Sequence, residues 1–249
     1  MFSNKYIFIY SSVLVIIVAV LLALAATLLK PAQEINIKTE KMQQILQSAG
    51  IKSPTKETIS IYHKYITNEL IINIEGEILS DFAQGEFSKG NERAFDINLK
   101  EELRKLSGKT PTPKDVRLPL FVLINDQKDT VYVIPLIGKG LWGPVWGNIA
   151  LKSDKNTIAG VRFGHKSETP GLGAEIETPM FQNQFLGKQI FDENGNFTSI
   201  KVVKGGVANS SINPIHGVDA ISGGTITSKG VNNMLEVCLK NYESFLKTK

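Results

Sequence analysis

The stretch LPLFVLINDQKDTVYVIPLI, residues 118–137, decides the fold class expected for this chain. Its two apolar runs, Leu118–Asn125 and Thr130–Ile137, flank a short polar segment, which is the pattern of a β-hairpin. A second hairpin is predicted where Asn148–Leu151 and Ile158–His165 flank the residues SDKNT. Strands joined in hairpins and accompanied by helices favour an α+β fold of antiparallel strands and flanking helices over a parallel βαβ fold.

Local periodicity predicts the remaining elements. Apolar residues at helical spacing indicate an amphipathic helix over Ser228–Leu246, and shorter helices are expected at Lys100–Leu106 and Thr178–Leu186. The run Glu69–Leu79 alternates apolar and polar residues and is interpreted as one strand, and Phe197–Val203 is interpreted as another.

The composition is that of an ordinary globular protein, with 42% hydrophobic and 21% charged residues in a chain of 249. A net charge of +4 without a basic run argues against a nucleic-acid partner. The single cysteine, Cys238, excludes an intramolecular disulfide and is interpreted as a small buried hydrophobic residue. No metal site is expected, because His63, His165 and His216 share no ligand spacing.

The N-terminal part of the chain predicts a membrane anchor. Residues 6–29 carry no charge, and a helix of that length spans roughly 36 Å, more than the ~30 Å hydrocarbon core of a bilayer. A cleaved signal peptide is the alternative, since Ala23 and Ala25 form a small-x-small site, but the apolar stretch is longer than a signal core. Only Lys5 precedes the span, so charge leaves its orientation open, although a long polar C-terminal part is compatible with an extracytoplasmic domain.

These observations divide the chain into four expected parts. The parts are a short tail at 1–5, a transmembrane helix at 6–29, a helical stalk and connection at 30–68, and a globular domain at 69–249.

The segment GVDAISGGTITS, residues 217–228, is the candidate functional site. Its paired glycines allow a large group to approach the backbone, and a helix beginning near Ser228 would direct unpaired N–H groups at this loop, which suits a phosphate. A plain turn with a Ser or Thr N-cap explains the local pattern equally well. A serine hydrolase is a weaker alternative, because the Ala220-x-Ser222-x-Gly224 spacing approaches a nucleophile elbow but no histidine follows His216. The hydroxyl side chains of the segment are Ser222, Thr225, Thr227 and Ser228.

Three other glycine-containing segments are candidates for ligand contact. Gly138–Gly147, with the sequence GKGLWGPVWG, is predicted to be a loop in which Trp142 can stack on a planar ligand. The segment SETPGLG, residues 167–173, contains a Pro-Gly turn, and Lys204 precedes two glycines at the end of a strand. Taken singly, 167–173 is by default an ordinary loop, and a tryptophan such as Trp142 is more often a core aromatic.

Taken in order, the motifs GKGLW, SETPGLG, VVKGG and HGVDAISGGTITSKGV resemble those of the NqrC family, whose members are subunits of the sodium-translocating NADH:quinone oxidoreductases. The N-terminal span and residues 190–194 are similar too, so the resemblance covers essentially the whole chain and is most specific from Leu141 to Val231. The RnfG family, from the related Rnf/Rsx electron-transport complex, shares the flavin motif and the anchor, and is the competing family.

The resemblance implies a covalently bound FMN. In this family a flavin transferase joins the FMN phosphate to the threonine of a Ser-Gly-Ala-Thr motif that an aspartate precedes. The resemblance places the phosphoester on Thr225, and Gly224 departs from the pattern, which has alanine there. The residues implied in recognition by the transferase are Asp219, Ser222, Gly223 and Thr225. The residues implied in further FMN contacts are Trp142, Glu168, Thr169, Gly171, Leu172, Lys204, Ser222, Gly223, Gly224 and Thr227.

The resemblance also implies a function: an electron-carrier subunit of a bacterial inner-membrane complex that passes electrons from NADH to quinone and exports Na⁺. The expected partners are the flavin- and iron–sulfur-bearing membrane subunits of that complex and the FMN transferase, and the bulk of the chain would face the periplasm. No residue is expected to act as a catalytic acid or base. A membrane-anchored extracytoplasmic ligand-binding or assembly protein without redox activity is the alternative from another class.

Overall fold

The computed structural model describes residues 3–106 and 115–248. Residues 1–2 of the expected tail and residues 107–114 of the expected globular domain lie outside the described residues. The chain divides into two units, Met1–Lys41 and Met42–Lys249.

Unit Met1–Lys41 consists of the greater part of one long helix, α1 (Asn4–Ser48), which continues through Pro31. Its most apolar window has a mean hydropathy of 3.0, and none of that window is buried by other parts of the protein. Within the described residues, α1 is the one helix long and apolar enough to cross a membrane. These properties fit a single-pass membrane anchor.

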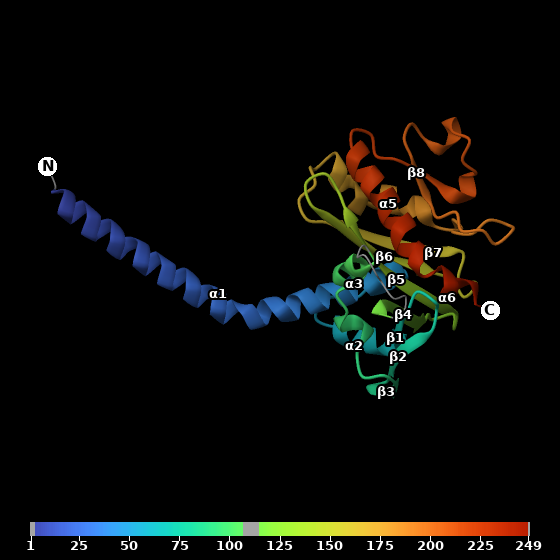
Figure 1. The fold of residues 1–249 in the computed structure, drawn as a ribbon, viewed down its shortest axis with the longest axis horizontal. Helices are drawn as coiled ribbons and strands as arrows, with labels where there is room; N and C mark the ends of the chain where they lie inside the picture. The colour runs from blue at the N-terminus through green and yellow to red at the C-terminus, as the bar shows by residue number, and fades with distance from the viewer. Residues whose placement is uncertain (1–2, 107–114, 249) are drawn as a thin grey trace. The chain divides into compact units, whose positions relative to one another are not determined.

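Unit Met42–Lys249 is built on a seven-stranded sheet of order β3-β2-β1-β4-β5-β6-β7, in which all neighbours pair antiparallel (Figure 1). The predicted α+β class with antiparallel strands is therefore confirmed. In chain order the strands are β1 (Ile66–Ile72), β2 (Ile78–Ala83), β3 (Glu86–Lys89), β4 (Leu118–Ile124), β5 (Thr130–Lys139), β6 (Pro144–Leu151) and β7 (Ile158–His165).

Helices and short 3-10 turns flank the sheet. The helices of this unit, besides the end of α1, are α2 (Thr58–Tyr65), α3 (Leu99–Lys105), α4 (Pro179–Gln182), α5 (Thr225–Asn241) and α6 (Glu243–Lys247). The 3-10 turns are η1 (Ala94–Asp96), η3 (Gly173–Glu177), η4 (Asn183–Phe185), η5 (Val207–Asn209) and η6 (Pro214–His216). A separate parallel pair joins β8 (Lys201–Val203) to β9 (Gly217–Asp219).

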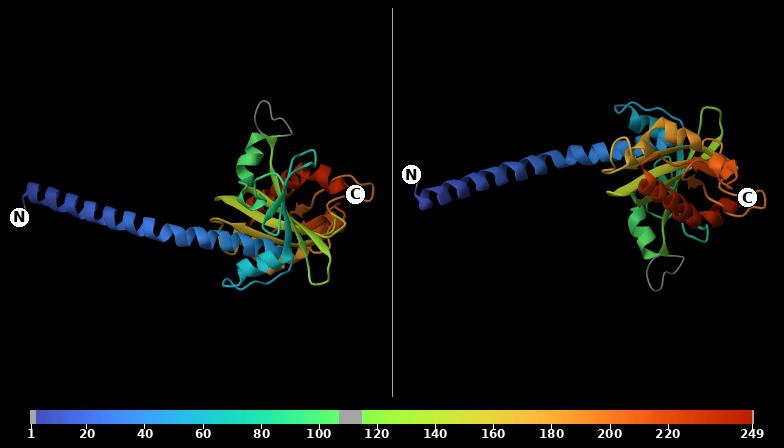
Figure 2. Two further views of the ribbon diagram at one scale, coloured as in Figure 1. Left: turned by 90° about the horizontal axis from the view of Figure 1, so that it is seen from below. Right: turned by 90° about the horizontal axis from the view of Figure 1, so that it is seen from above.

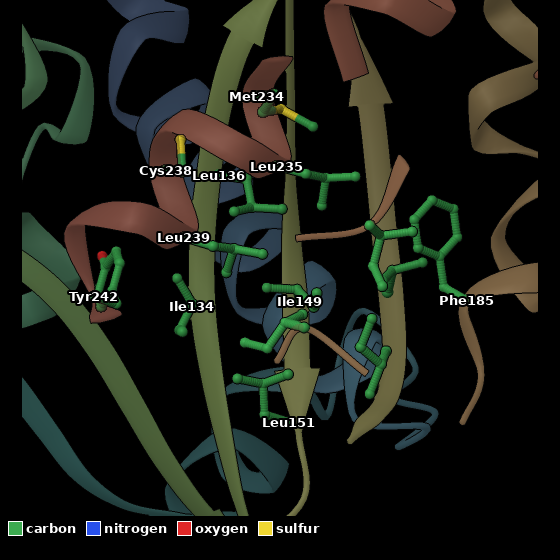
Figure 3. Packing of buried hydrophobic residues seen from close by; sticks show 14 of the residues in the cluster. Ile134, Leu136, Ile149, Leu151, Phe185, Met234, Leu235, Cys238, Leu239 and Tyr242 are labelled. Atoms are coloured by element: carbon green, nitrogen blue, oxygen red, sulfur yellow. The ribbon is translucent and has the colours of Figure 1, made fainter. Parts of the chain in front are cut away.

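The sheet is apolar on both faces because its central strands alternate between two cores. In β5, Val131 and Val133 point into the core that the end of α1 and α2 cover, whereas Ile134 and Leu136 point into the core beneath α5 and α6. Figures 1 and 2 show α5, in red, lying against the strands of this second face. The labelled side chains Met234, Leu235, Cys238 and Leu239 of α5 face the strand residues in Figure 3.

Helix α5 also covers an unpaired edge of β5. Strand β4 pairs only with Thr130–Val133, so the rest of β5 has no strand on that side. The backbone N–H of Ile137 donates to the Sγ atom of Cys238 at 3.5 Å, and the thiol approaches the carbonyl oxygen of Ile137 at 3.4 Å. Cys238 is fully buried, as the sequence predicts, and it satisfies backbone groups that an edge strand leaves open.

One prediction near the first strands is wrong. Residues 69–79 are not one strand, because the chain turns between β1 and β2 at Gly76, whose φ of +86° suits glycine. The segment after residue 80 contains the end of β2 and all of β3, joined by a turn at Gln84 and Gly85.

Other boundaries shift in the second half of the chain. The predicted loop 138–147 is mostly strand, since β5 extends to Lys139 and β6 begins at Pro144. The predicted strand Phe197–Val203 shortens to β8, and the final helix begins at Thr225, three residues before the expected start. The helices predicted at Lys100–Leu106 and Thr178–Leu186 correspond to α3 and to α4 with η4.

Candidate functional site

The site is organised around the first turn of α5. Gly224 is the N-cap residue and contributes no side-chain hydrogen bond, so this helix does not have the Ser or Thr N-cap of the plain-turn alternative. The first intrahelical bond runs from the N–H of Ser228 to the carbonyl oxygen of Gly224, which leaves the N–H groups of Thr225–Thr227 without helical partners. Thr225, half-buried, is therefore the first helical residue at a helix end that attracts anions.

The glycine loop before α5 packs against a second loop. Gly223 has a φ of +75°, and a β-carbon there would lie 2.5 Å from Cδ2 of Leu172. Gly224 has an ordinary φ of −98°, but a β-carbon there would lie 3.0 Å from Cγ2 of Ile221 and 3.2 Å from the carbonyl oxygen of Leu172. Ile221 and Leu172 therefore pack closely against the glycine at position 224.

A pocket of about 210 Å³ opens beside Thr225. Three segments form it: the turn between β5 and β6, the loop after β7, and the start of α5. Its walls carry apolar side chains alongside hydroxyl groups and one carboxylate. The lining residues are Leu141, Glu168, Thr169, Leu172, Gly173, Gly223, Gly224, Thr225, Ile226 and Thr227.

Glu168 joins the three segments. Its side chain is buried, with 4% of the residue exposed. Oε1 accepts a hydrogen bond from the backbone N–H of Trp142 at 2.8 Å, and Oε2 accepts one from the hydroxyl of Thr227 at 2.5 Å. Its own N–H donates to Nδ1 of His165 at 3.1 Å, which places the neutral imidazole proton on Nε2.

The pocket brings together most of the residues that the sequence singled out. Those that line it are Glu168, Thr169, Leu172, Gly223, Gly224, Thr225 and Thr227. Trp142 does not line it and is 65% exposed, although its neighbour Leu141 does. Gly171 turns the adjoining loop with a φ of +74°, and its N–H donates to Glu175. Ser222 is exposed in the loop just before the pocket.

Two further expected residues, Lys204 and Asp219, also lie outside this pocket. Lys204 is exposed after β8. Asp219 ends β9, where Oδ1 accepts the N–H of Val207 at 2.7 Å and its own N–H donates to Gln184. Neither residue is among those that line the cavity.

Three lining residues, Leu141, Gly173 and Ile226, belong to candidate segments of the sequence but were not named individually as FMN contacts. Leu141 and Ile226 are exposed apolar side chains next to Trp142 and Thr225, so their position beside candidate residues was the available signal. Gly173 lies where a β-carbon would come within 2.5 Å of both Thr227 and Glu168, a constraint that only the folded chain reveals.

The described residues contain no cluster of three or more His, Cys, Asp or Glu side chains able to hold a metal ion. Nδ1 of His216 lies 2.6 Å from the carbonyl oxygen of Gln189 and 3.3 Å from the hydroxyl of Thr198, so this ring nitrogen is engaged by partners other than Ser222. This geometry gives no support to the serine-hydrolase alternative.

Residues 140–240, which contain the whole pocket, match the family model of the FMN-binding domain. The residues present fit that cofactor: a glycine loop and a helix start suit a phosphate, and apolar walls suit a flat ring. The fold and the site thus define an FMN-binding domain carried by a single apolar helix of membrane-spanning length.

Curated relatives specify the family further. The chain is 32% identical over 232 residues to the NqrC subunit of the Na(+)-translocating NADH-quinone reductase of Vibrio vulnificus strain YJ016, covering 90% of this chain and 86% of the relative. It is 31% identical over 248 residues to the corresponding subunit of Pseudomonas aeruginosa, covering 94% and 91%. The chain belongs to the NqrC family of Na(+)-translocating NADH-quinone reductase subunits.

Solved structures of this family share the fold. The NqrC subunit from Parabacteroides distasonis superimposes with a TM-score of 0.74 at 38% identity, covering 89% of this chain and 98% of that one. NqrC from Shewanella oneidensis gives a TM-score of 0.64 at 28% identity, covering 84% and 96%. Of the two families that the motifs resemble, the comparisons therefore favour NqrC over RnfG.

Proposed function

We propose that Thr225 carries FMN through a phosphoester between its hydroxyl and the FMN phosphate. The observation that carries the proposal is the difference between the hydroxyl groups of the site. Thr225 is half-buried, lines the pocket and begins α5, whereas Thr227 is buried and donates to Glu168. The hydroxyl of Ser228 accepts the N–H of Ile221 at 3.1 Å, and Ser222 does not line the pocket.

The unpaired N–H groups at the start of α5 would hold the phosphate oxygens, and the helix dipole favours that negative charge. A cavity of about 210 Å³ is smaller than the roughly 300–1,000 Å³ of pockets that enclose whole ligands. The apolar wall would therefore cover only part of the ring system, and the remainder would stay accessible to a partner subunit. When bound, FMN supplies transfer of one or two electrons.

The function supported by this arrangement is an electron-carrier subunit of a Na(+)-translocating NADH-quinone reductase, the complex named for the relatives. Its partners are the other subunits of that complex, and we propose that the electron donor and acceptor are among its flavin- and iron–sulfur-bearing members. The protein's own side chains bind and orient the cofactor, and none is required as a general acid or base.

Several finer assignments belong to the same proposal. Residues 6–29 of α1 would span the bacterial inner membrane, residues 30–68 would form the connection, and the domain 69–249 would face the periplasm. A flavin transferase would recognise Asp219, Ser222, Gly223 and Thr225. Exposure of Asp219 and Ser222 supports this role, because an enzyme that modifies Thr225 must reach the residues around it. Contacts of Trp142, Gly171 and Lys204 with the cofactor are likewise proposed.

The test is in-gel flavin fluorescence after denaturation of the full-length chain, co-expressed with the transferase. A covalent flavin gives a fluorescent band that Thr225→Ala abolishes. Thr227→Ala is the matched control and keeps the band, because that buried hydroxyl already donates to Glu168. A dark wild-type band would contradict covalent attachment and leave the non-redox alternative. If Thr227→Ala lost the band and Thr225→Ala kept it, the ester would lie on Thr227 and the choice of Thr225 would be wrong.

A further inference from the structure

The carboxylate of Glu168 is a buried group in the wall of the pocket that Thr225 enters. Both of its oxygen atoms accept hydrogen bonds, and both donors, the N–H of Trp142 and the hydroxyl of Thr227, are neutral. Its carboxylate forms no salt bridge within residues 3–106 and 115–248. A pair of donors suits the ionised carboxylate, since the protonated form would need an acceptor for its own proton.

The surrounding backbone is shaped around this carboxylate. A β-carbon on Gly140 would lie 2.5 Å from Oε1 of Glu168, and one on Gly173 would lie 2.5 Å from Oε2. Glycine at both positions therefore lets two chain segments close over the charged group. Such an arrangement holds a negative charge at a fixed place beside the cavity, where the low local dielectric weakens screening.

Building on the proposed attachment of FMN to Thr225, we infer that the charge of Glu168 lowers the reduction potential of the bound flavin. Each electron that FMN accepts adds one negative charge, unless a proton from solvent accompanies it. A fixed carboxylate in the pocket wall repels that added charge and disfavours reduction. The electrons come entirely from the donor.

Two substitutions separate the charge from the geometry. Glu168→Gln removes the charge, while its amide oxygen can still accept from Trp142 and its NH₂ group can donate to the Thr227 oxygen. Glu168→Asp keeps the charge and alters the hydrogen bonds. Glu177→Gln is the matched control, because it removes the same charge from the same region but from a side chain that is 41% exposed.

The full-length flavinylated proteins, in detergent, are titrated with dithionite while the flavin absorbance reports the oxidised fraction. In Glu168→Gln the reduction equilibrium shifts about tenfold towards the reduced flavin, a rise of about 59 mV for one electron. Glu177→Gln and Glu168→Asp stay close to the wild-type potential.

Each outcome bears on the inference. An unchanged potential in Glu168→Gln overturns it, and so does an equal rise in Glu168→Asp, which would assign the effect to geometry. If Glu168→Gln does not fold, Glu168→Asp decides alone, since an equivalent rise there contradicts the charge effect and a wild-type potential supports it. The in-gel band is recorded on the same samples, so failure of flavin attachment is distinguished from failure of the charge effect.

Discussion

Gly230 of α5 packs directly on the backbone of Lys139 at the end of β5. A β-carbon on Gly230 would lie 2.3 Å from the carbonyl oxygen of Lys139 and 3.4 Å from Cα of Gly140. This contact sets the depth at which α5 sits against the sheet, and so it sets where Thr225 meets the turn that carries Leu141.

Gly230→Ala is expected to destabilise the domain. Alanine would gain about 1 kcal/mol of helix propensity, but the clash is with backbone that cannot rotate away, and overpacking of this kind costs about 1–3 kcal/mol. Thermal or urea unfolding followed by tryptophan fluorescence measures the difference. The exposed neighbour Lys229→Ala serves as control and leaves the midpoint unchanged. An unfolding midpoint of Gly230→Ala at or above that of wild type would contradict the packing described.

Trp142 provides a test of ring placement. It is exposed beside the pocket, and an indole stacked on a flavin quenches the flavin's emission. Trp142→Ala is therefore expected to raise flavin fluorescence in the native protein while leaving the denatured in-gel band unchanged.

The control is the second tryptophan. Trp146 packs against Gly164, where a β-carbon would lie 2.6 Å from the indole Nε1. Trp146→Phe leaves native flavin emission at the wild-type level. Equal brightening in both variants would show that the Trp142 ring does not stack on the flavin.

The buried thiol of Cys238 is expected to lower the stability of the folded domain at alkaline pH. Burial raises its pKa to about 11, above the 9.0 of a free thiol. Because the unfolded state loses this proton first, stability falls as pH rises from about 9 to about 11, by at most about 1.4 kcal/mol per pH unit. Urea midpoints measured across this range are expected to fall, and the fall is shallower in Cys238→Ala. Burial also raises the pKa of Tyr242, which accounts for a decline that persists in the variant.

The carboxylate of Glu102 is expected to make the folded domain less stable at acid pH. Burial alone would raise its pKa, but hydrogen bonds from Arg117 and Lys105 outweigh burial and hold the pKa below its ordinary value of 4.5. A carboxyl group with a lowered pKa stabilises the native state above its unfolded pKa, and that contribution is lost as pH falls below about 4.5.

Arg117→Met removes the two side-chain bonds from Arg117 to Glu102, which run from Nε and Nη2 at 3.1 and 2.7 Å. It is expected to cost roughly 1–3 kcal/mol at neutral pH and to move the acid unfolding transition to higher pH. Lys105→Met is the matched control with a smaller effect, because Lys105 makes one bond to this carboxylate and is more exposed. Identical acid transitions in the two variants would contradict this ranking.

The antiparallel core could be predicted from the sequence because its signal is local. The hairpin 118–137 alternates between two buried faces and has a polar turn, and both properties are visible without tertiary information. The turn at Gly76 was missed because the alternation of apolar and polar residues continues on both sides of it. There a β-carbon would lie 2.8 Å from the backbone nitrogen of Phe245, a partner far along the chain.

The candidate site was predictable to a different extent. The run of hydroxyls and glycines at 222–228 predicted a phosphate-binding loop, and the resemblance selected Thr225. The position of Glu168 as a buried group was not predictable, since carboxylates are rarely buried and nothing local marks this one. Its burial depends on Gly140 and Gly173, which lie in two different segments.

The docking of α5 also determines when the pocket comes into existence. Glu168 contacts Thr227, 59 positions further along the chain, and Ile137 contacts Cys238, 101 positions further along. Both contacts can therefore form only after α5 has been synthesised. A chain cut off before α5 would retain the strands of the sheet but have neither the pocket nor Thr225. The FMN attachment proposed for Thr225 would therefore be confined to chains whose synthesis has passed α5, and a bound flavin would mark a chain that has been made and folded that far.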